Sequence, residues 1–168
     1  ILTKFFQTKK GKQILSFISL KTPIFGKITK KVNCAKFARS FSSLMKSGVP
    51  IIDSLNVVSQ IVTNTFYSNS LLEITNKIKE GEKMQESLEK YKNLYPALVT
   101  QMIGVGEQTG ELSEIMGRLA EFYEEEVKNV TDNLTSIIEP VLMIILGGAV
   151  AFFAISMIQP MYSMMQGI

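Results

Sequence analysis

The sequence predicts an all-α fold, a cytoplasmic six-helix bundle whose last helix continues into a C-terminal transmembrane helix. Apolar residues in the middle of the chain recur every three or four positions, which is the period of an amphipathic helix. No segment shows the sustained apolar–polar alternation of a strand. Near the C-terminus, residues 140–158 carry no charge, and Ser156 is the one polar side chain among them.

Six helices are expected in chain order, with glycines and prolines at their limits. Gly48 and Gly81 are expected to end the first and third helices, and Pro50 and Pro96 to open the second and fifth. The apolar faces that define the helices are Phe37, Phe41 and Leu44; Ile51, Leu55, Val58 and Val62; Leu71, Ile74 and Ile78; Met84, Leu88 and Tyr91; Leu98, Met102 and Val105; and Ile115, Leu119, Phe122, Val130, Leu134 and Ile137.

A glycine-rich stretch, Gly-Val-Gly-Glu-Gln-Thr-Gly at residues 104–110, comes before the last helix. It follows a helix rather than a strand, so it is a weak candidate for a phosphate-binding loop. We expect a tight turn between two helices instead, formed by Gly106, Glu107, Thr109 and Gly110. In this turn Thr109 would be the N-cap of the last helix.

The uncharged stretch is predicted to cross a membrane. Its nineteen residues from 140 to 158 would extend about 28 Å at a rise of 1.5 Å per residue, close to the ~30 Å hydrocarbon core of a bilayer. A buried core helix is the alternative, but this stretch has no polar face to turn toward water.

Particular residues of the predicted span have expected roles. Glu139 and Pro140 lie where the helix would enter the membrane. Gly147, Gly148 and Ala151 would let another helix pack closely within the membrane, since small residues four apart permit a close approach.

Charge is distributed unevenly along the chain. Residues 1–40 carry ten Lys or Arg and no acid, whereas the rest carries eight basic and fifteen acidic residues. A basic N-terminal arm of this kind is typical of segments that bind membrane lipid or nucleic acid. We favour lipid, because the sequence matches no nucleic-acid-binding module. The positive-inside rule then places the bundle in the cytoplasm.

The predicted organisation has four parts. A basic juxtamembrane arm, expected to follow another membrane span, is succeeded by the bundle, a transmembrane helix and a short extracytoplasmic tail. Their boundaries are 1–31, 32–136, 137–158 and 159–168. Because the chain begins with Ile1 rather than Met, we expect it to be part of a longer protein.

Composition excludes several chemistries. The chain has no His and a single cysteine, Cys34, so neither a Ser/His/Asp triad nor a Cys/His zinc site can be built, and no intramolecular disulfide can form. The acidic run that contains Glu121, Glu124 and Glu125 is interpreted as a solvated helix face that could contact a partner. Glu124 with Lys128, and Glu114 with Arg118, are four residues apart and are expected to be ordinary surface pairs. We therefore expect no catalytic, cofactor-binding or metal-binding residue.

Five stretches of this chain resemble a known family, the inner-membrane platform proteins of type II secretion systems and type IV pili (the GspF/PilC family). The stretches are Thr-Pro-Ile-Phe-Gly-Lys at 22–27, Phe-Ala-Arg-Ser-Phe at 37–41, Lys-Ser-Gly-Val-Pro at 46–50, Met-Ile-Gly-Val-Gly-Glu-Gln-Thr-Gly-Glu-Leu at 102–112 and Ile-Glu-Pro-Val-Leu at 138–142. The resemblance implies two copies of a six-helix cytoplasmic domain and three membrane spans, of which this chain would supply the second copy and the third span.

The resemblance also implies a function without catalysis. Members of the family are scaffolds in the bacterial inner membrane, placed between a cytoplasmic assembly ATPase and pilin or pseudopilin subunits, beside other inner-membrane components of the machine. We also expect a homo-oligomer that does not bind nucleic acid. The sequence leaves open a platform for a DNA-uptake pseudopilus, a transporter subunit, a membrane-anchored enzyme and a basic nucleic-acid binder.

Overall fold

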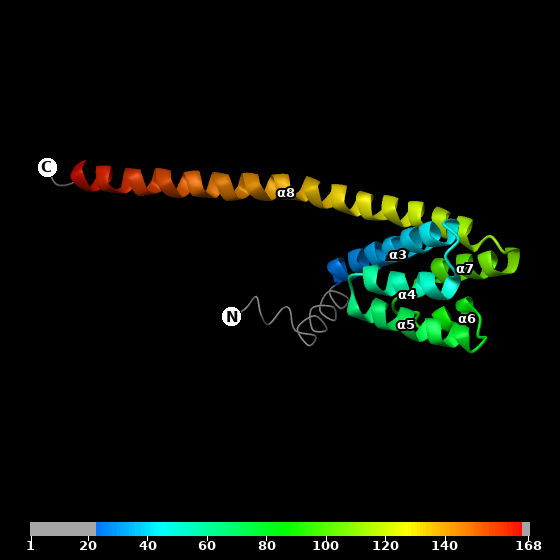
Figure 1. Ribbon diagram of the computed structural model, residues 1–168. Coiled ribbons are helices and arrows are strands. Elements are labelled where there is room, and N and C mark those ends of the chain that lie inside the picture. The colour runs from blue at the N-terminus through cyan, green and yellow to red at the C-terminus, as the bar shows by residue number, and fades with distance from the viewer. Residues whose placement is uncertain (1–22, 166–168) are drawn as a thin grey trace. The chain divides into compact units, whose positions relative to one another are not determined.

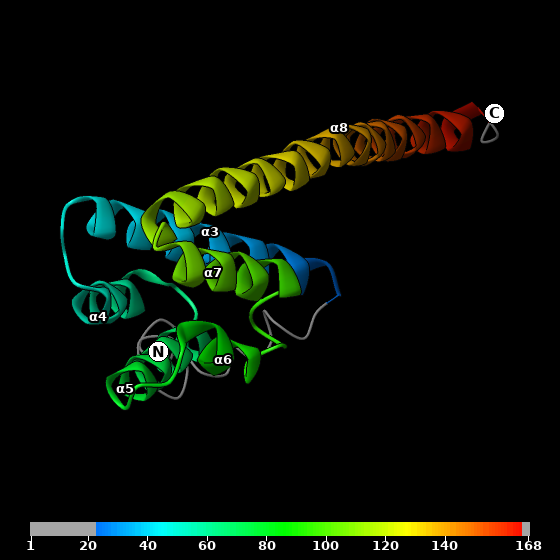
Figure 2. The ribbon, with the colours of Figure 1, turned by 90° about the vertical axis from the view of Figure 1, so that its right-hand side faces the viewer.

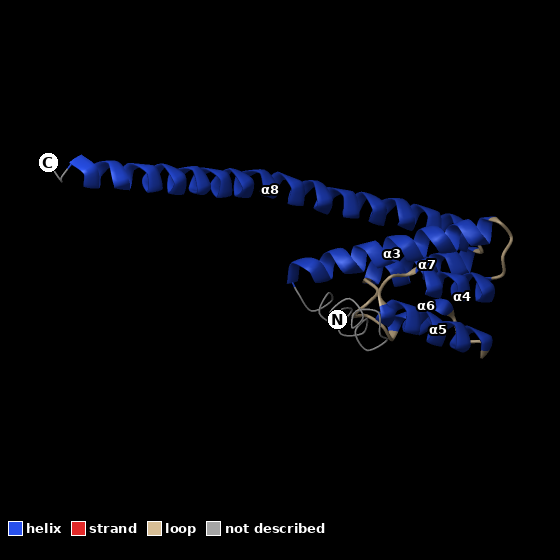
Figure 3. Ribbon diagram, turned by 60° about the vertical axis from the view of Figure 1, so that its left-hand side comes forward, coloured by secondary structure: helices blue, strands red, loops and turns tan. Residues whose placement is uncertain are grey.

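The computed structural model describes the backbone of residues 23–165 and the side chains of residues 26–133, 139–140 and 142–155. The described backbone forms six helices and no strand, as Figures 1 and 3 show. They are α3 (Pro23–Lys46), α4 (Ile51–Ile61), α5 (Thr65–Lys79), α6 (Met84–Glu89), α7 (Ala97–Thr109) and α8 (Leu112–Met165). The all-α prediction is confirmed for this part of the chain.

The chain divides into two units, residues 1–127 and residues 128–168. The first unit contains α3 to α7 and the first turns of α8, and it has a hydrophobic core of its own. The described part of the second unit is the remainder of α8.

Glycine and proline delimit the helices as the sequence predicts. After α3 the chain turns at Gly48, whose φ of 81° is a left-handed conformation that a side chain disfavours. The backbone N–H of Gly48 donates to the carbonyl of Met45 at 3.0 Å. Pro50 and Pro96 are the N-cap residues of α4 and α7.

The helical region begins earlier than the predicted bundle. Helix α3 starts at Pro23, so residues 23–31 of the predicted basic arm are helical, and the boundary at residue 31 stays a prediction. Lys31 donates through Nζ to Glu126 Oε2 at 2.6 Å, which ties the end of this stretch to α8. Residues 1–22 lie outside the described part of the chain.

Among the described residues, no helix combines the length and the apolar character needed to cross a membrane. The span predicted over residues 137–158 includes 137, 138, 141 and 156–158, whose side chains lie outside the description. That span and the tail at 159–168 stay predictions.

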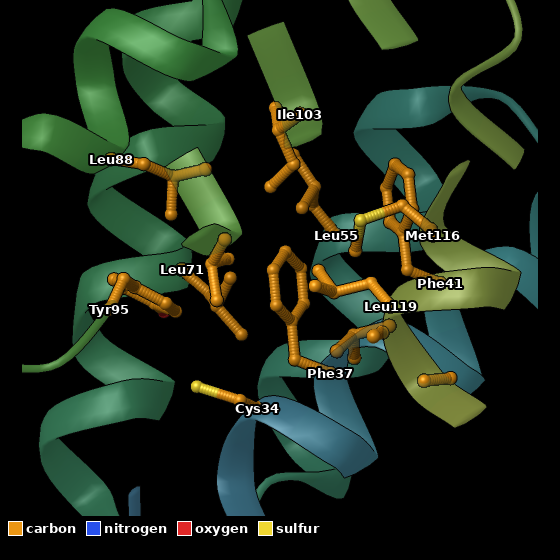
Figure 4. Close-up of a cluster of buried hydrophobic side chains, with 14 of the residues drawn as sticks. Cys34, Phe37, Phe41, Leu55, Leu71, Leu88, Tyr95, Ile103, Met116 and Leu119 are labelled. Carbon is orange, nitrogen blue, oxygen red and sulfur yellow. The ribbon is translucent and has the colours of Figure 1, made fainter. Parts of the chain in front are cut away.

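Aromatic side chains organise the core of the first unit (Figure 4). Phe37 lies between Phe41 and Tyr95, with ring centroids 6.0 and 5.8 Å away, and Tyr95 meets Tyr67 edge-on at 5.2 Å. All four side chains are fully or almost fully buried. Cys34 is buried among them, and burial raises the pKa of its thiol to about 12.

The phenol groups of this core are satisfied by nearby polar atoms. Tyr67 donates its hydroxyl to the carbonyl of Leu94, and the Tyr95 hydroxyl lies 2.9 Å from Ser70 Oγ. Two chain segments far apart in sequence are joined in the same way, since Asn33 Oδ1 accepts from the backbone N–H of Asn64 at 3.2 Å. Leaving one of these buried polar groups without a partner would cost free energy of folding, so the hydrogen bonds favour one arrangement of the core side chains.

The buried face of α8 differs from the predicted one. We expected Ile115, Leu119 and Phe122 on that face, but Phe122 is 46% exposed and Ile115 is half-buried. The buried side chains are instead Leu112, Met116, Leu119, Ala120 and Tyr123. The stripe is displaced because α8 packs against α3 as well as α7, and the small residue Gly117 lets α3 approach on that side.

Candidate functional site

The glycine-rich stretch is part of a helix, which corrects the prediction of a turn. Gly106, Glu107 and Thr109 lie within α7, and of the four residues expected to form the turn only Gly110 does so. Gly110 has a φ of 75° and ends α7 in the left-handed conformation typical of a helix C-terminus. Glycine disfavours a helix by about 1 kcal/mol relative to alanine, so the packing around Gly104 and Gly106 must outweigh their propensity.

Thr109 is not the N-cap of the last helix. Its hydroxyl donates to the carbonyl of Val105 at 3.0 Å and accepts from the backbone N–H of Glu111 at 3.3 Å. Helix α8 begins at Leu112, so Thr109 stabilises the end of α7 and the link that follows. Only residues 110 and 111 separate the two helices, and Figure 2 shows the end of α7 next to the start of α8.

Glu107 caps a neighbouring helix. Its Oε1 accepts from the backbone N–H of Met84 at 2.7 Å, and its Oε2 accepts from that of Gln85 at 3.0 Å. These are N–H groups of the first turn of α6, which have no partner within their own helix. Lys83, at the N-cap position, makes no side-chain capping bond, so the carboxylate on α7 performs this task and also meets the positive end of the helix dipole.

The two helical glycines let two different neighbours approach α7. A Cβ at Gly104 would lie 2.1 Å from Gln85 Oε1, at the end of a flexible side chain on α6. A Cβ at Gly106 would lie 2.9 Å from the Cα of Leu112, at the start of α8. The contact at Gly106 is the stricter one, because a backbone atom cannot move aside as a side chain can.

A surface pocket of about 440 Å³ opens over this segment. Its lining includes Met45, Ile51, Lys83 and Gln85, together with Gly104, Gly106, Glu107, Gln108, Gly110 and Leu112. Both oxygens of Glu107 are engaged in capping α6, and in the described part of the chain no group of three His, Cys, Asp or Glu residues could hold a metal ion. The arrangement joins α6, α7 and α8, and nothing in it activates a nucleophile.

A second set of polar contacts fastens α3 to the first turns of α8, and we call it the α3–α8 clamp. Arg39 binds Glu124 with two hydrogen bonds, Nε to Oε1 at 2.8 Å and Nη2 to Oε2 at 2.6 Å. Ser42 donates to the carbonyl of Ser113 at 2.7 Å, and the Lys31–Glu126 pair completes the set. A Cβ at Gly117 would lie 3.1 Å from Ser42 Oγ, a tight contact that glycine avoids.

The acidic run on α8 is divided by these contacts. Glu124, which the sequence suggested would pair with Lys128, faces α3, and the hydrogen bonds from Arg39 lower the pKa of its carboxyl. Glu121 and Glu125 are exposed. The expected pair of Glu114 with Arg118 is confirmed at 2.7 Å. A partner contact at Glu121, Glu124 or Glu125 stays a prediction.

The residues proposed to act in the membrane lie on α8 in the second unit. Glu139 and Pro140 are helical and exposed. Gly147, Gly148 and Ala151 are also exposed, and a Cβ at either glycine would meet no heavy atom within 4 Å. Their predicted roles, at the membrane surface and in helix packing, stay predictions.

A comparison with known protein families decides the assignment. The family described as "Type II secretion system (T2SS), protein F" matches residues 37–160, which include the bundle from the middle of α3 and most of α8. The chain belongs to the protein F family. The resemblance to GspF/PilC proteins that the five sequence stretches indicate is thereby confirmed.

Individual relatives of this protein F family member come from both pilus and secretion systems. The chain is 36% identical over 159 residues to the type IV pilus assembly protein PilC of Myxococcus xanthus, and the match covers 95% of the chain and 38% of the relative. It is 34% identical to PilC of Pseudomonas aeruginosa, over 94% of the chain and 42% of the relative. With the type II secretion system protein F of Aeromonas hydrophila it shares 29% identity, over 85% of the chain and 37% of the relative. The chain thus spans about two fifths of these curated relatives.

The contacts of the glycine-rich stretch in this family member were only partly legible from the sequence. The pattern shows glycines and a carboxylate, but the partners of Glu107 lie 22 and 23 residues away, on α6. One signal was available, since α6 has Lys83 rather than Ser, Thr, Asp or Asn before its first residue and therefore lacks a local cap. The α3–α8 clamp joins residues 71 to 95 apart and has no local sequence signal.

Proposed function

We propose that this chain is part of a non-enzymatic platform protein of the bacterial inner membrane, which couples a cytoplasmic assembly ATPase to the polymerisation of pilin or pseudopilin subunits. Membership of the protein F family carries the proposal. The names of the relatives refer to type IV pilus assembly and to type II secretion. The absence of His and the engagement of Glu107 in capping a helix are consistent with a scaffold.

Exposed apolar side chains on α8 support the membrane location. The described large apolar side chains between 142 and 155 are between 51% and 74% exposed, and they are Leu142, Met143, Ile144, Ile145, Leu146, Val150, Phe152, Phe153 and Ile155. Residues on every face of the helix are included, whereas a helix on the surface of a soluble domain is apolar along one face. Lipid over residues 137–158 would cover them all, with Glu139 and Pro140 at the cytoplasmic boundary.

Helix α8 is the element that would transmit motion. Its first turns are held in the bundle by the α3–α8 clamp and by the contact at Gly106, so movement of the bundle would move them too. Its later turns carry Gly147, Gly148 and Ala151, where a pilin helix or the helix of a second copy would pack. In this proposal the ATPase acts on the bundle and α8 conveys the movement to the membrane.

The experiment is a complementation test in the bacterium that carries the gene. Deleting the full-length gene should abolish one of three activities, piliation, secretion or DNA uptake, and the activity lost identifies the machine. Crosslinking the intact protein in membranes should yield adducts with an assembly ATPase and with a pilin-like subunit. Retention of all three activities in the deletion strain would overturn the proposal.

A variant tests the membrane contact. Replacing Gly147 and Gly148 together by leucine should abolish fibre assembly while the thermal unfolding of the bundle stays unchanged, because the two positions lie outside the first unit. Leucine at Ala154 is the matched control, since it adds bulk to an exposed site on the same helix without altering the glycine pair. Normal assembly by the double variant would remove the proposed role of these glycines.

A further inference from the structure

A row of apolar side chains lies on the outer side of the hairpin formed by α7 and α8. On α7, Leu98 is 38% exposed and Val105 is 46% exposed, and Phe122 on α8 is 46% exposed. Met102 and Ile115 are half-buried. We call these five residues the hairpin strip.

The geometry of the hairpin makes the strip continuous. A two-residue link makes α7 and the first turns of α8 antiparallel, and Gly106 holds them in contact, since a Cβ there would lie 3.5 Å from the Cβ of Ile115. Phe122 is two turns beyond Ile115, and Leu98 is about two turns before Gly106, roughly 10–12 Å in each direction. Leu98 and Phe122 are therefore at the end of the hairpin away from the link, Val105 and Ile115 are near the link, and Met102 lies between.

The border of the strip is acidic on the α8 side. Four exposed glutamates are there, and they are Glu111, Glu114, Glu121 and Glu125. Arg118 is the one basic residue among them, and it pairs with Glu114. On the α7 side the exposed polar residues are Gln101 and Gln108, which are neutral. The border as a whole therefore carries a net negative charge.

This charge decides which occupant fits. An anionic lipid surface would be repelled, and so would the same face of a second copy, which would bring glutamates against glutamates. Nucleic acid is excluded for the same reason. A cationic partner with apolar side chains satisfies both the strip and its border.

We propose that the hairpin strip binds a basic amphipathic helix of a partner protein. Apolar residues one and two turns apart on that helix would cover Leu98, Val105 and Phe122, and its Lys or Arg residues would meet Glu121 and Glu125. Glu124 takes no part, because Arg39 already binds it. The inference rests on the proposed function for the assembly machine in which the partner is found, and it adds the chemistry by which the bundle recognises that partner.

Site-specific photocrosslinking in cells tests the assignment. The probe is a benzoylphenylalanine placed at Val105 or at Phe122 of the full-length protein, and Leu72 on α5, which is 44% exposed, is the matched control position. We expect adducts from both strip positions and none from Leu72. Mass spectrometry of the adduct should identify a Lys/Arg-rich amphipathic segment of another protein. Adducts with lipid, with a second copy or with an acidic segment would overturn the proposal, as would the absence of adducts.

A charge reversal supplies the second measurement. The double variant Glu121→Lys, Glu125→Lys should lower the adduct yield at Val105 by at least about tenfold, since like charges across an interface repel. Glu86→Lys, at an exposed glutamate on α6, should leave the yield unchanged. A designed helix of leucine and lysine should compete for the adduct, whereas one of leucine and glutamate should not. Equal effects of the two reversals or of the two peptides would overturn the proposal.

The result is separable from the proposed function. If deletion of the gene abolishes assembly but the strip yields no basic adduct, the platform function stands and this inference fails. If the deletion strain assembles its fibres normally, the platform function fails whatever the crosslinks show.

Discussion

Glu107→Ala removes the carboxylate that accepts two backbone hydrogen bonds from the first turn of α6. The N–H groups of Met84 and Gln85 lose their partners, which lie at 2.7 and 3.0 Å. Loss of an N-terminal cap costs about 1–2 kcal/mol. Such a loss corresponds to a fall in Tm of about 5–10 °C for a domain the size of the bundle.

The assay has a global and a local measurement. Thermal unfolding of the full chain in detergent, followed by circular dichroism, reports the change in Tm. Hydrogen exchange at the amides of Met84 and Gln85 reports the cap itself, and both amides should exchange faster in the variant. Glu107→Gln keeps one carbonyl acceptor and should fall between the two proteins.

The control is Glu125→Ala, which removes an exposed carboxylate from α8. We expect its free energy of unfolding to stay within about 0.5 kcal/mol of the unaltered protein. If Glu107→Ala matches this control in Tm and in the exchange of both amides, the carboxylate does not stabilise α6 and the interpretation of the glycine-rich stretch is wrong.

Three further predictions concern the bundle. Gly106→Ala should destabilise it by about 1–2 kcal/mol, because a Cβ would lie 2.9 Å from a backbone atom. Gly104→Ala should be near neutral, because the neighbouring Gln85 side chain can move aside. Equal urea midpoints for the two variants would contradict this. Arg39 lowers the pKa of Glu124 below its usual 4.5, so the stability from this pair is present above that pH and is lost as the pH falls through the lower folded pKa. The pair is partly exposed, so the loss is at most about 1 kcal/mol, and Arg39→Gln should remove this acid-side component from urea midpoints measured against pH. The thiol of Cys34, with a pKa of about 12 and no exposure, should react with a thiol reagent at pH 8 only as the bundle unfolds, and rapid labelling in the native state would refute its burial.

Helix limits were predictable because they depend on local chemistry. Gly48 adopts a positive φ and Pro50 lacks a backbone N–H, and both properties hold whatever surrounds them. The same reasoning located Pro96 before α7. It failed at Gly104 and Gly106, which lie inside α7. At Gly106 a residue that disfavours helices is tolerated because the backbone of Leu112 lies too close for a side chain.

The acidic run shows a similar division. Counting residues along α8 predicts that Glu114 pairs with Arg118, and it does. The same count pairs Glu124 with Lys128, yet Glu124 binds Arg39, 85 residues earlier in the chain. A bidentate pair with a planar guanidinium is stronger than a contact between two flexible side chains on one helix surface.

By itself, the sequence determined the helical class of this chain, the helix limits set by Gly48, Pro50 and Pro96, the chemistries the chain lacks and its family. Backbone preferences, composition and motifs can all be read within a few residues. Only the tertiary structure decided that Glu107 caps α6, that α8 buries Met116 and Tyr123 rather than Phe122, and that Glu124 binds Arg39 on α3. Each of these depends on which helix lies alongside, and contacts between residues 20 to 95 positions apart arise only when the whole bundle has packed.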